Sequence, residues 1–262
     1  LTLVARSGCG NRIAPRTFDR ADVCPNPPDG DALDDVDGNP IALQRPGHYL
    51  QITRDNGSAE NPWVFRLTTD YGASWRPVFE LRDAPWGPFQ VAGGPDDPVL
   101  YQAVMRPGRT DSGATRLGLV RIEGVYRPGG ATVAAADGAG FGAIGIFPTM
   151  FPWYPVFGVS PREPDRVIVA DVQTNEARMT TDGGRTWAPV AGLTSLVTAG
   201  GARVFQRNTF PTITHIAFDP IVRCHVLVGT WDGGIAQSTD RGSTWRLFPG
   251  SEGVWNVSSF YF

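Results

Sequence analysis

The sequence contains no lysine, since all 23 basic side chains are arginine, and its formal net charge is −3. Nucleic acids and anionic membrane surfaces attract basic patches, so this charge favours neither partner. No stretch approaches the roughly 20 apolar residues of a transmembrane helix. The three histidines, His48, His215 and His225, are too scattered for a zinc motif. We therefore expect no metal, no cofactor, no nucleic acid and no transmembrane segment.

Cysteine is also scarce, with three residues in the chain. Cys9 and Cys24 flank a polar, proline-rich segment, and a disulfide closing that loop would suit an oxidising compartment. Cys224 lies in the apolar run 221–228 and is expected to be a buried free thiol. We therefore expect a periplasmic or extracellular protein, with any membrane association made through a partner.

Glycine and proline are abundant, at 32 and 23 residues. Such a composition excludes a helical bundle and is typical of many short strands joined by tight turns. At 262 residues the chain is long enough for one large all-β domain.

An internal repeat organises the chain. Three segments align without gaps as Ser/Thr, any residue, Asp, any residue, Gly, any residue, Ser/Thr, Trp. Their fixed positions are Thr68, Asp70, Gly72, Ser74 and Trp75; Thr180, Asp182, Gly184, Thr186 and Trp187; and Ser238, Asp240, Gly242, Thr244 and Trp245. In a hairpin turn the aspartate accepts backbone hydrogen bonds, the glycine takes a positive φ, and the tryptophan opens the next strand.

This pattern resembles the Asp-box, or BNR, repeat of sialidases, sortilin-like receptors, xyloglucan-cleaving enzymes and a photosystem II assembly propeller. The resemblance implies an all-β fold, a β-propeller of four-stranded antiparallel blades. It also implies that the box is structural and joins the third and fourth strands of a blade. It supplies no active site.

The spacing of the aspartates predicts at least four blades, because the interval from Asp70 to Asp182 is close to twice that from Asp182 to Asp240. A blade without a box is expected between the first two boxes. We expect an irregular segment over residues 1–47 and propeller blades over 48–262. The expected boundaries are 48–80, 89–127, 155–190 and 213–249, with an inner strand at 254–262.

The two ends leave two interpretations open. The first blade has no obvious inner strand before residue 48, whereas residues 254–262 form an inner strand with no blade after it. The last strand could complete the first blade and close a small ring. Otherwise the chain is a fragment of a larger propeller.

No catalytic pair stands out in the sequence. Residues 11–15 resemble the sialidase arginine motif imperfectly. We favour a surface position for Arg12 over a role in binding the carboxylate of a substrate. Glycosidases need two carboxylates about 5–9.5 Å apart. Asp171, Glu176, Asp232 and Glu252 fall near strand ends, but no two of them have a diagnostic context. The acidic run 31–39 lacks the glutamate of a calcium loop and is interpreted as solvated.

The uncharged segment 141–154 is rich in large apolar residues. One interpretation is a buried connection between blades, and the other is an exposed contact surface for a protein, a membrane interface or a sugar ring. Its candidate partner-binding residues are Phe147, Phe151, Trp153 and Tyr154. We favour an extracytoplasmic, non-catalytic binding or scaffold propeller that belongs to a larger protein assembly. The alternative is a sialidase-like or endoglucanase-like glycoside hydrolase with an axial active site, so carbohydrate remains a candidate ligand.

Overall fold

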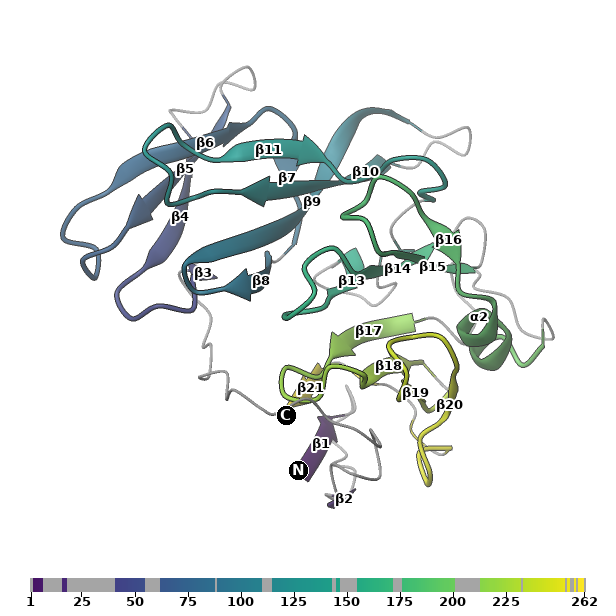
Figure 1. Cartoon of the computed structure of the whole chain (residues 1–262). Helices are drawn as coiled ribbons and strands as arrows, with labels where there is room; N and C mark the ends of the chain where they lie inside the picture. Colours follow the sequence, from purple (N-terminus) through teal and green to yellow (C-terminus); the bar gives the residue numbers. More distant parts are fainter. Residues whose placement is uncertain are drawn as a thin grey trace.

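The structure is a computed structural model. It describes residues 2–6, 16–17, 41–54, 62–87, 89–109, 115–142, 145–146, 155–171, 176–200, 213–231, 233–252, 254, 257 and 259–261. Over these residues the chain is nearly all β, with one short helix, α2 (Ala191–Val197). Four antiparallel sheets of four or five strands follow one another along the chain, and a three-stranded sheet joins its two ends (Figure 1). These sheets form an all-β propeller with at least four blades.

Blade 1 has the strand order β3-β4-β5-β6. Its strands are β3 (Ile41–Ala42), β4 (Tyr49–Arg54), β5 (Trp63–Thr68) and β6 (Arg76–Leu81). The sequence predicts no inner strand for this blade, but β3 pairs with β4 and takes that place. The difference arises because a two-residue strand has no detectable periodicity.

Blade 2 is built around β9 (Asp97–Arg109), which pairs with β8 (Gln90–Gly94) near its start and with β7 (Ala84–Pro85) further along. The remaining strands are β10 (Thr115–Glu123) and β11 (Thr132–Ala135). The fourth strand therefore lies beyond the expected boundary at residue 127. Residues 124–131 form turns that delay it.

Blades 3 and 4 each contain one of the two later repeats. Blade 3 consists of β12 (Gly145–Ile146), β13 (Pro155–Val159), β14 (Val167–Asp171), β15 (Glu176–Thr180) and β16 (Ala188–Pro189). Blade 4 consists of β17 (Ile213–Phe218), β18 (Val226–Thr230), β19 (Ile235–Ser238) and β20 (Arg246–Leu247). Each runs in chain order through its sheet.

The terminal sheet has the order β2-β1-β21. Its strands are β1 (Thr2–Arg6), β2 (Arg16–Thr17) and β21 (Ser259–Tyr261). The last strand pairs antiparallel with β1, so both ends of the chain meet in this sheet (Figure 1). The last strand therefore does not complete the first blade, and strands β1 to β3 occur within the segment 1–47 that the sequence predicts to be irregular.

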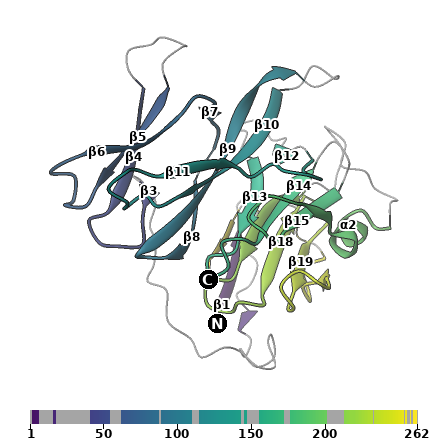
Figure 2. The ribbon, with the colours of Figure 1, turned by 45° about the horizontal axis from the view of Figure 1, so that its top comes forward.

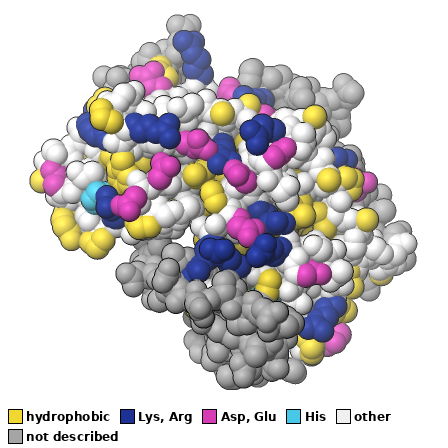
Figure 3. All heavy atoms as spheres, viewed as in Figure 1, with side chains coloured by type: hydrophobic (Ala, Val, Ile, Leu, Met, Phe, Trp, Pro, Cys, Tyr) yellow, Lys and Arg dark blue, Asp and Glu magenta, His cyan; other side chains and the backbone are white. Residues whose placement is uncertain are grey.

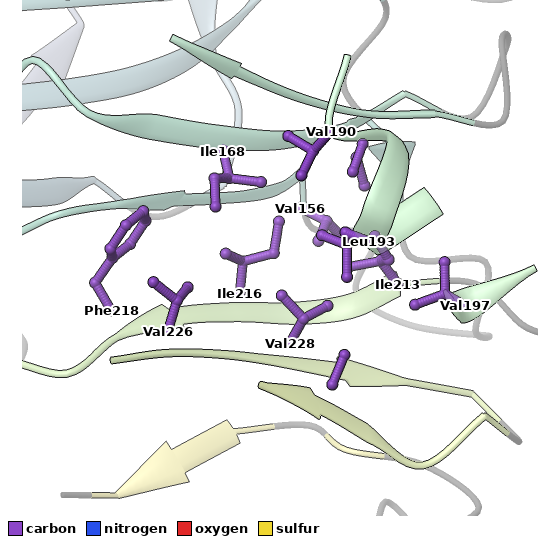
Figure 4. Packing of buried hydrophobic residues seen from close by; sticks show 13 residues of the cluster. Val156, Ile168, Val190, Leu193, Val197, Ile213, Ile216, Phe218, Val226 and Val228 are labelled. Atoms are coloured by element: carbon purple, nitrogen blue, oxygen red, sulfur yellow. The ribbon is translucent and has the colours of Figure 1, made fainter. Parts of the chain in front are cut away.

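The blades pack face to face through separate hydrophobic cores. Blades 1 and 2 share a core around Phe65 and Leu100, and blades 2 and 3 share one around Tyr101 and Phe157. Blades 3 and 4 enclose a third core that includes Ile216, while α2 covers its edge (Figure 4). Strands β13 and β18 are buried along their whole length, because both faces of an internal blade meet a neighbour. Figure 2 shows the resulting succession of sheets from another angle.

Candidate functional site

The three repeated segments form equivalent turns. They join the last two strands of blade 1 (β5 to β6), blade 3 (β15 to β16) and blade 4 (β19 to β20). We call them turns 1, 3 and 4 after their blades. Blade 2 lacks such a turn and instead bends at Gly124, with φ of 70°.

Turn 3 shows the hydrogen bonds that fix this geometry. The Thr180 hydroxyl donates to Asp182 Oδ1 over 2.8 Å, and the Thr186 amide donates to the same oxygen over 2.9 Å. The Thr186 hydroxyl donates to Asp182 Oδ2 over 2.6 Å, and the Gly184 amide donates to Thr180 Oγ1 over 3.0 Å. The Trp187 indole donates to the Gly184 carbonyl over 3.2 Å. Every fixed residue of the repeat therefore takes part in one local network.

The same bonds recur in turns 1 and 4. The equivalent residues are Thr68, Asp70, Gly72, Ser74 and Trp75 in turn 1, and Ser238, Asp240, Gly242, Thr244 and Trp245 in turn 4. The three glycines have φ of 93°, 93° and 89°, a conformation that side chains with a Cβ resist.

The carboxylates of these turns are stabilised in their charged form. Hydrogen bonds from Ser74 and Thr68 lower the pKa of Asp70 to about 2. Bonds from the Thr186 hydroxyl and amide lower the pKa of Asp182 in the same way. Partial burial raises the pKa of Asp240, but hydrogen bonds outweigh it and the pKa is lowered. A general acid needs a raised pKa, so these three groups have the opposite property.

Each turn is tied to the turn between the first two main strands of its own blade. Tyr71 N donates to the Gly47 carbonyl over 3.1 Å, and Gly183 N donates to the Asp165 carbonyl over 3.0 Å. In blade 4, Arg241 N donates to the Cys224 carbonyl over 2.9 Å. These turns therefore lie at one end of the blades, which we call the turn end.

Arginine side chains bridge neighbouring blades at the turn end. The Arg121 guanidinium of blade 2 forms an ion pair with Asp165 of blade 3 and donates to the Tyr101 hydroxyl over 3.0 Å. Tyr101, which is fully buried, donates to the Pro164 carbonyl over 2.7 Å. Burial raises the pKa of Tyr101 to about 12, so the phenol remains a donor. Figure 3 shows acidic side chains beside basic ones over the visible face.

A second polar cluster lies at the opposite end of blade 2. Arg106 donates to both oxygens of Asp137, over 3.1 and 2.9 Å, and to Asp83 over 2.8 Å. All three side chains are half-buried. Gly118 leaves space for the pair, because a Cβ there would lie 2.6 Å from Asp137 Oδ2. Sequence reasoning misses this cluster, since its members come from three segments with no common motif.

The aromatic candidates Phe147, Phe151, Trp153 and Tyr154 lie outside the described residues, as do Arg12 and the acidic run 31–39. Asp232 also lies outside them. The candidate binding surface on this segment therefore stays a prediction.

The other carboxylates near strand ends do not form a described pair. Asp171 and Glu176 are partners in the β14–β15 ladder, but the Glu176 carboxylate binds Arg178 over 2.8 Å. Glu252 is exposed in the connection before β21. Within the described part of the chain, no group of three or more His, Cys, Asp or Glu residues could hold a metal ion.

The histidines occupy separate places. His48 Nδ1 lies 3.1 Å from the Tyr126 hydroxyl, and His225 Nδ1 lies 3.1 Å from Asp219 Oδ2 in a buried pair. His215 packs against Phe260 of β21, with ring centres 5.5 Å apart, and burial lowers its pKa to about 4. His48 and His215 thus contact a residue of a neighbouring sheet, whereas His225 and Asp219 belong to a turn of the same blade.

The prediction that Cys224 is a free thiol is wrong, because Cys224 is disulfide-bonded. The chain contains two other cysteines, Cys9 and Cys24, both outside the described residues. A bridge from Cys224 to either one competes with the expected Cys9–Cys24 bridge. An apolar neighbourhood cannot distinguish a free thiol from a disulfide, which explains the error.

Fold and turns together define a β-propeller with three equivalent Asp–Gly–Trp turns. No protein-family model matches the chain, and no curated protein matches it. None of the described helices is long and apolar enough to cross a membrane.

The chain is similar to solved structures at low identity. It is 16% identical to the GH74 xyloglucanase from Xanthomonas campestris, with a TM-score of 0.41, covering 92% of this chain and 32% of the enzyme. It is 14% identical to a mutant Trypanosoma rangeli sialidase with trans-sialidase activity, with a TM-score of 0.39, covering 77% of this chain and 35% of that one. The chain thus spans about a third of the length of these enzymes.

The chain is also 13% identical to YCF48 in a structure with a D1 peptide, with a TM-score of 0.32. That match covers 78% of this chain and 69% of YCF48. At these identities, none of the three neighbours carries its activity over to this chain.

Proposed function

We propose that this chain is a non-catalytic binding or scaffold propeller that works outside the cytoplasm as a component of a larger protein assembly. The observation that carries the proposal is the use of its described carboxylates. Some of these carboxylates form ion pairs with arginines, as Asp83, Asp137, Asp165 and Glu176 do. Others accept the hydrogen bonds that fix the three turns. Groups committed to ion pairs and turns stabilise a scaffold and leave little acid–base capacity for catalysis.

We also infer that the three turns are Asp-box repeats. The inference is supported by the shared hydrogen bonds of Asp70, Asp182 and Asp240 and by the position of each turn between the last two strands of its blade. In this proposal the boxes stabilise the blades, and binding takes place elsewhere.

The proposed compartment is supported by Cys224. Stable disulfides form in oxidising compartments such as the periplasm or the exterior of the cell and are rare in the cytosol. A bonded Cys224 therefore favours an extracytoplasmic protein.

The proposed contact surface is the aromatic segment with Phe147, Phe151, Trp153 and Tyr154. Large aromatic side chains are enriched at the centres of protein interfaces. The test replaces Phe147, Phe151 and Trp153 by serine and compares cross-linked assemblies in the native host with those of the wild type. We expect the assembly to be lost while the urea midpoint of the isolated protein is unchanged. An intact assembly, or a large fall in the stability of the isolated protein, would contradict the proposal that this segment is a contact surface.

The alternative function is a glycoside hydrolase. The carboxylates that such an enzyme would have to use are Asp83 and Asp137, which share the Arg106 guanidinium at the end of blade 2 opposite the turns. A hydrolase would release reducing sugar from xyloglucan or sialic acid from a sialoside, and both Asp83→Asn and Asp137→Asn would abolish that release. Absence of hydrolysis by the wild-type protein on both substrates would favour the scaffold.

A further inference from the structure

Arginine side chains gather at the turn end where blades 3 and 4 meet. Arg162 and Arg166 of blade 3 both donate to backbone carbonyls of blade 4, over 3.0 and 3.1 Å, and the second carbonyl is that of Arg241. Arg241 N donates to the Cys224 carbonyl, and the exposed Arg223 precedes Cys224 in the same turn. Figure 3 shows basic side chains gathered over this part of the visible face. We call Arg162, Arg166, Arg223 and Arg241 the arginine cluster.

The arginine cluster shares one carboxylate. Glu163 Oε2 accepts a hydrogen bond from Arg166 Nε over 2.8 Å, and Glu163 Oε1 lies 3.4 Å from Arg241 Nη1. Among the described residues, no side chain bonds to Arg223. The neighbouring carboxylate of Asp240 accepts the hydrogen bonds that fix turn 4. Four arginines therefore depend on one glutamate for their ion pairs with described residues.

The junctions between the earlier blades have a different balance of charge. Arg45 of blade 1 forms an ion pair with Asp96 of blade 2, so that junction has one arginine and one carboxylate. Arg121 of blade 2 binds two carboxylates, those of Glu123 and Asp165. Within the described ranges, an excess of arginine over carboxylate is thus specific to the junction of blades 3 and 4.

The excess has its cause in the turn between β17 and β18 of blade 4. Cys224 takes in this turn the place that Asp165 takes in blade 3, because each of the two carbonyls accepts the equivalent amide of turn 4 or turn 3. Cysteine supplies no negative charge to the arginines of blade 3. The acidic residue of the blade 4 turn, Asp219, is buried, where it accepts two backbone amides and lies 3.1 Å from His225 Nδ1. The fold therefore withholds a carboxylate from the arginine cluster.

We propose that the arginine cluster binds an acidic segment of a partner protein through Arg223 and Arg241. Arg223 is exposed, and the Arg241 side chain is 47% exposed, so both guanidinium groups reach solvent. A guanidinium binds a carboxylate through two parallel N–H donors. Arg162 and Arg166 hold the two blades together and add positive charge at the same place. This inference goes beyond the proposed function, because it names a partner chemistry and a surface other than the aromatic segment.

An acidic protein segment fits the arginine cluster better than a nucleic acid or a membrane does. Those two partners bind extended basic surfaces, whereas this chain has a formal net charge of −3 and an isoelectric point of about 5.6. The excess of arginine is confined to one junction between blades. A segment with two or three carboxylates needs only a few guanidinium groups at close range.

The test measures binding of N-acetyl-hexa-aspartate amide to the full chain by titration calorimetry, with N-acetyl-hexa-asparagine amide as the neutral probe. The variants are Arg223→Gln and the double variant Arg223→Gln/Arg241→Gln. The matched control is Arg185→Gln, which removes an exposed arginine of turn 3 whose carbonyl bonds to Ala139. We expect binding to weaken about two- to fivefold in the single variant and about five- to twentyfold in the double variant. Binding by the control should equal that of wild type, and salt at about 0.5 M should weaken it in all of them.

Stability separates a loss of binding from a loss of folding. Arg223→Gln should leave the urea midpoint unchanged, because the exposed side chain bonds to no described residue. Weaker peptide binding at an unchanged midpoint would support the proposal. Serine substitutions at Phe147, Phe151 and Trp153 should not alter peptide binding, so failure of the aromatic surface and failure of the arginine cluster can be told apart.

Several outcomes would overturn the proposal. They are equal binding of the neutral peptide, unchanged binding by the double variant, and an equal loss of binding in Arg185→Gln. Equal affinity for a thymidine oligonucleotide or for phosphatidylserine vesicles would assign the cluster to a nucleic acid or a membrane. Stronger peptide binding after Asp34→Asn and Asp35→Asn would assign it to the acidic run 31–39 of this chain.

Discussion

The glycines of the three turns form a matched series for testing how the blades pack. Gly72, Gly184 and Gly242 share nearly the same φ, but an added Cβ would meet different surroundings. At Gly72 it would lie 3.7 Å from the Trp75 ring, an ordinary contact. At Gly184 it would lie 2.6 Å from the Cα of Ala136, which is backbone of the neighbouring blade. The backbone strain is therefore common to both positions, and the steric clash is specific to Gly184.

We expect Gly72→Ala to lower the free energy of unfolding by about 1–2 kcal/mol, the cost of a positive φ. Gly184→Ala adds the cost of overpacking, about 1–3 kcal/mol, so its total loss should be about 2–5 kcal/mol. Gly242→Ala should fall between them, because its Cβ would lie 3.3 Å from the flexible Met179 Sδ.

Urea unfolding followed by tryptophan fluorescence measures these losses, provided that the slope of the transition stays the same. Equal losses for Gly72→Ala and Gly184→Ala would refute the reasoning. They would mean that residue 136 does not rest on turn 3, and the packing of blade 2 against blade 3 would need revision.

The stability of the protein should fall as the pH drops from 6.5 to 4, because burial lowers the pKa of His215 to about 4 and the unfolded chain binds the proton first. The loss should reach about 3 kcal/mol in urea titrations at a series of pH values. Tyr101→Phe should cost about 1–2 kcal/mol, because it removes a buried hydroxyl that bonds to Pro164 and Arg121. Thiol titration of the denatured, unreduced chain should find one free thiol, since one bridge involving Cys224 uses two of the three cysteines.

Each of these predictions has a control. His215→Gln should flatten the pH dependence between pH 6.5 and 4, and an unchanged profile would exclude His215 as its cause. Tyr71→Phe should leave stability nearly unchanged, because its hydroxyl belongs to an exposed residue. If it costs as much as Tyr101→Phe, the assigned bonds do not explain the loss. Three free thiols would rule out the disulfide.

The sequence predicted the main blades because their pattern is local. Strand, turn and strand recur within short windows, and the runs around 99–105 and 166–170 are apolar enough to identify. The missed inner strand β3 has two residues, and β11 (Thr132–Ala135) consists of small residues after a glycine-rich turn. Neither strand has an alternation of apolar and polar residues that is long enough to detect, and both depend on a neighbouring strand for their conformation.

The polar clusters could not be predicted for a different reason. Arg106 meets Asp83 and Asp137 only because three connections end at the same end of blade 2. The arginine contacts at the turn end likewise join residues of different blades, such as Arg121 with Asp165. Contacts of this kind depend on how the sheets pack against one another, and the spacing of residues within one segment does not predict that packing.

By itself, the sequence determined the turns. Asp70, Asp182 and Asp240 find all their partners within four residues, so the turn geometry follows from local chemistry. Tertiary structure alone decided that β21 pairs with β1, that Cys224 is bonded and that Arg121 of blade 2 covers Gly183 of turn 3. These features depend on which distant segments come together when apolar sheet faces are buried, and that choice is a property of the whole chain.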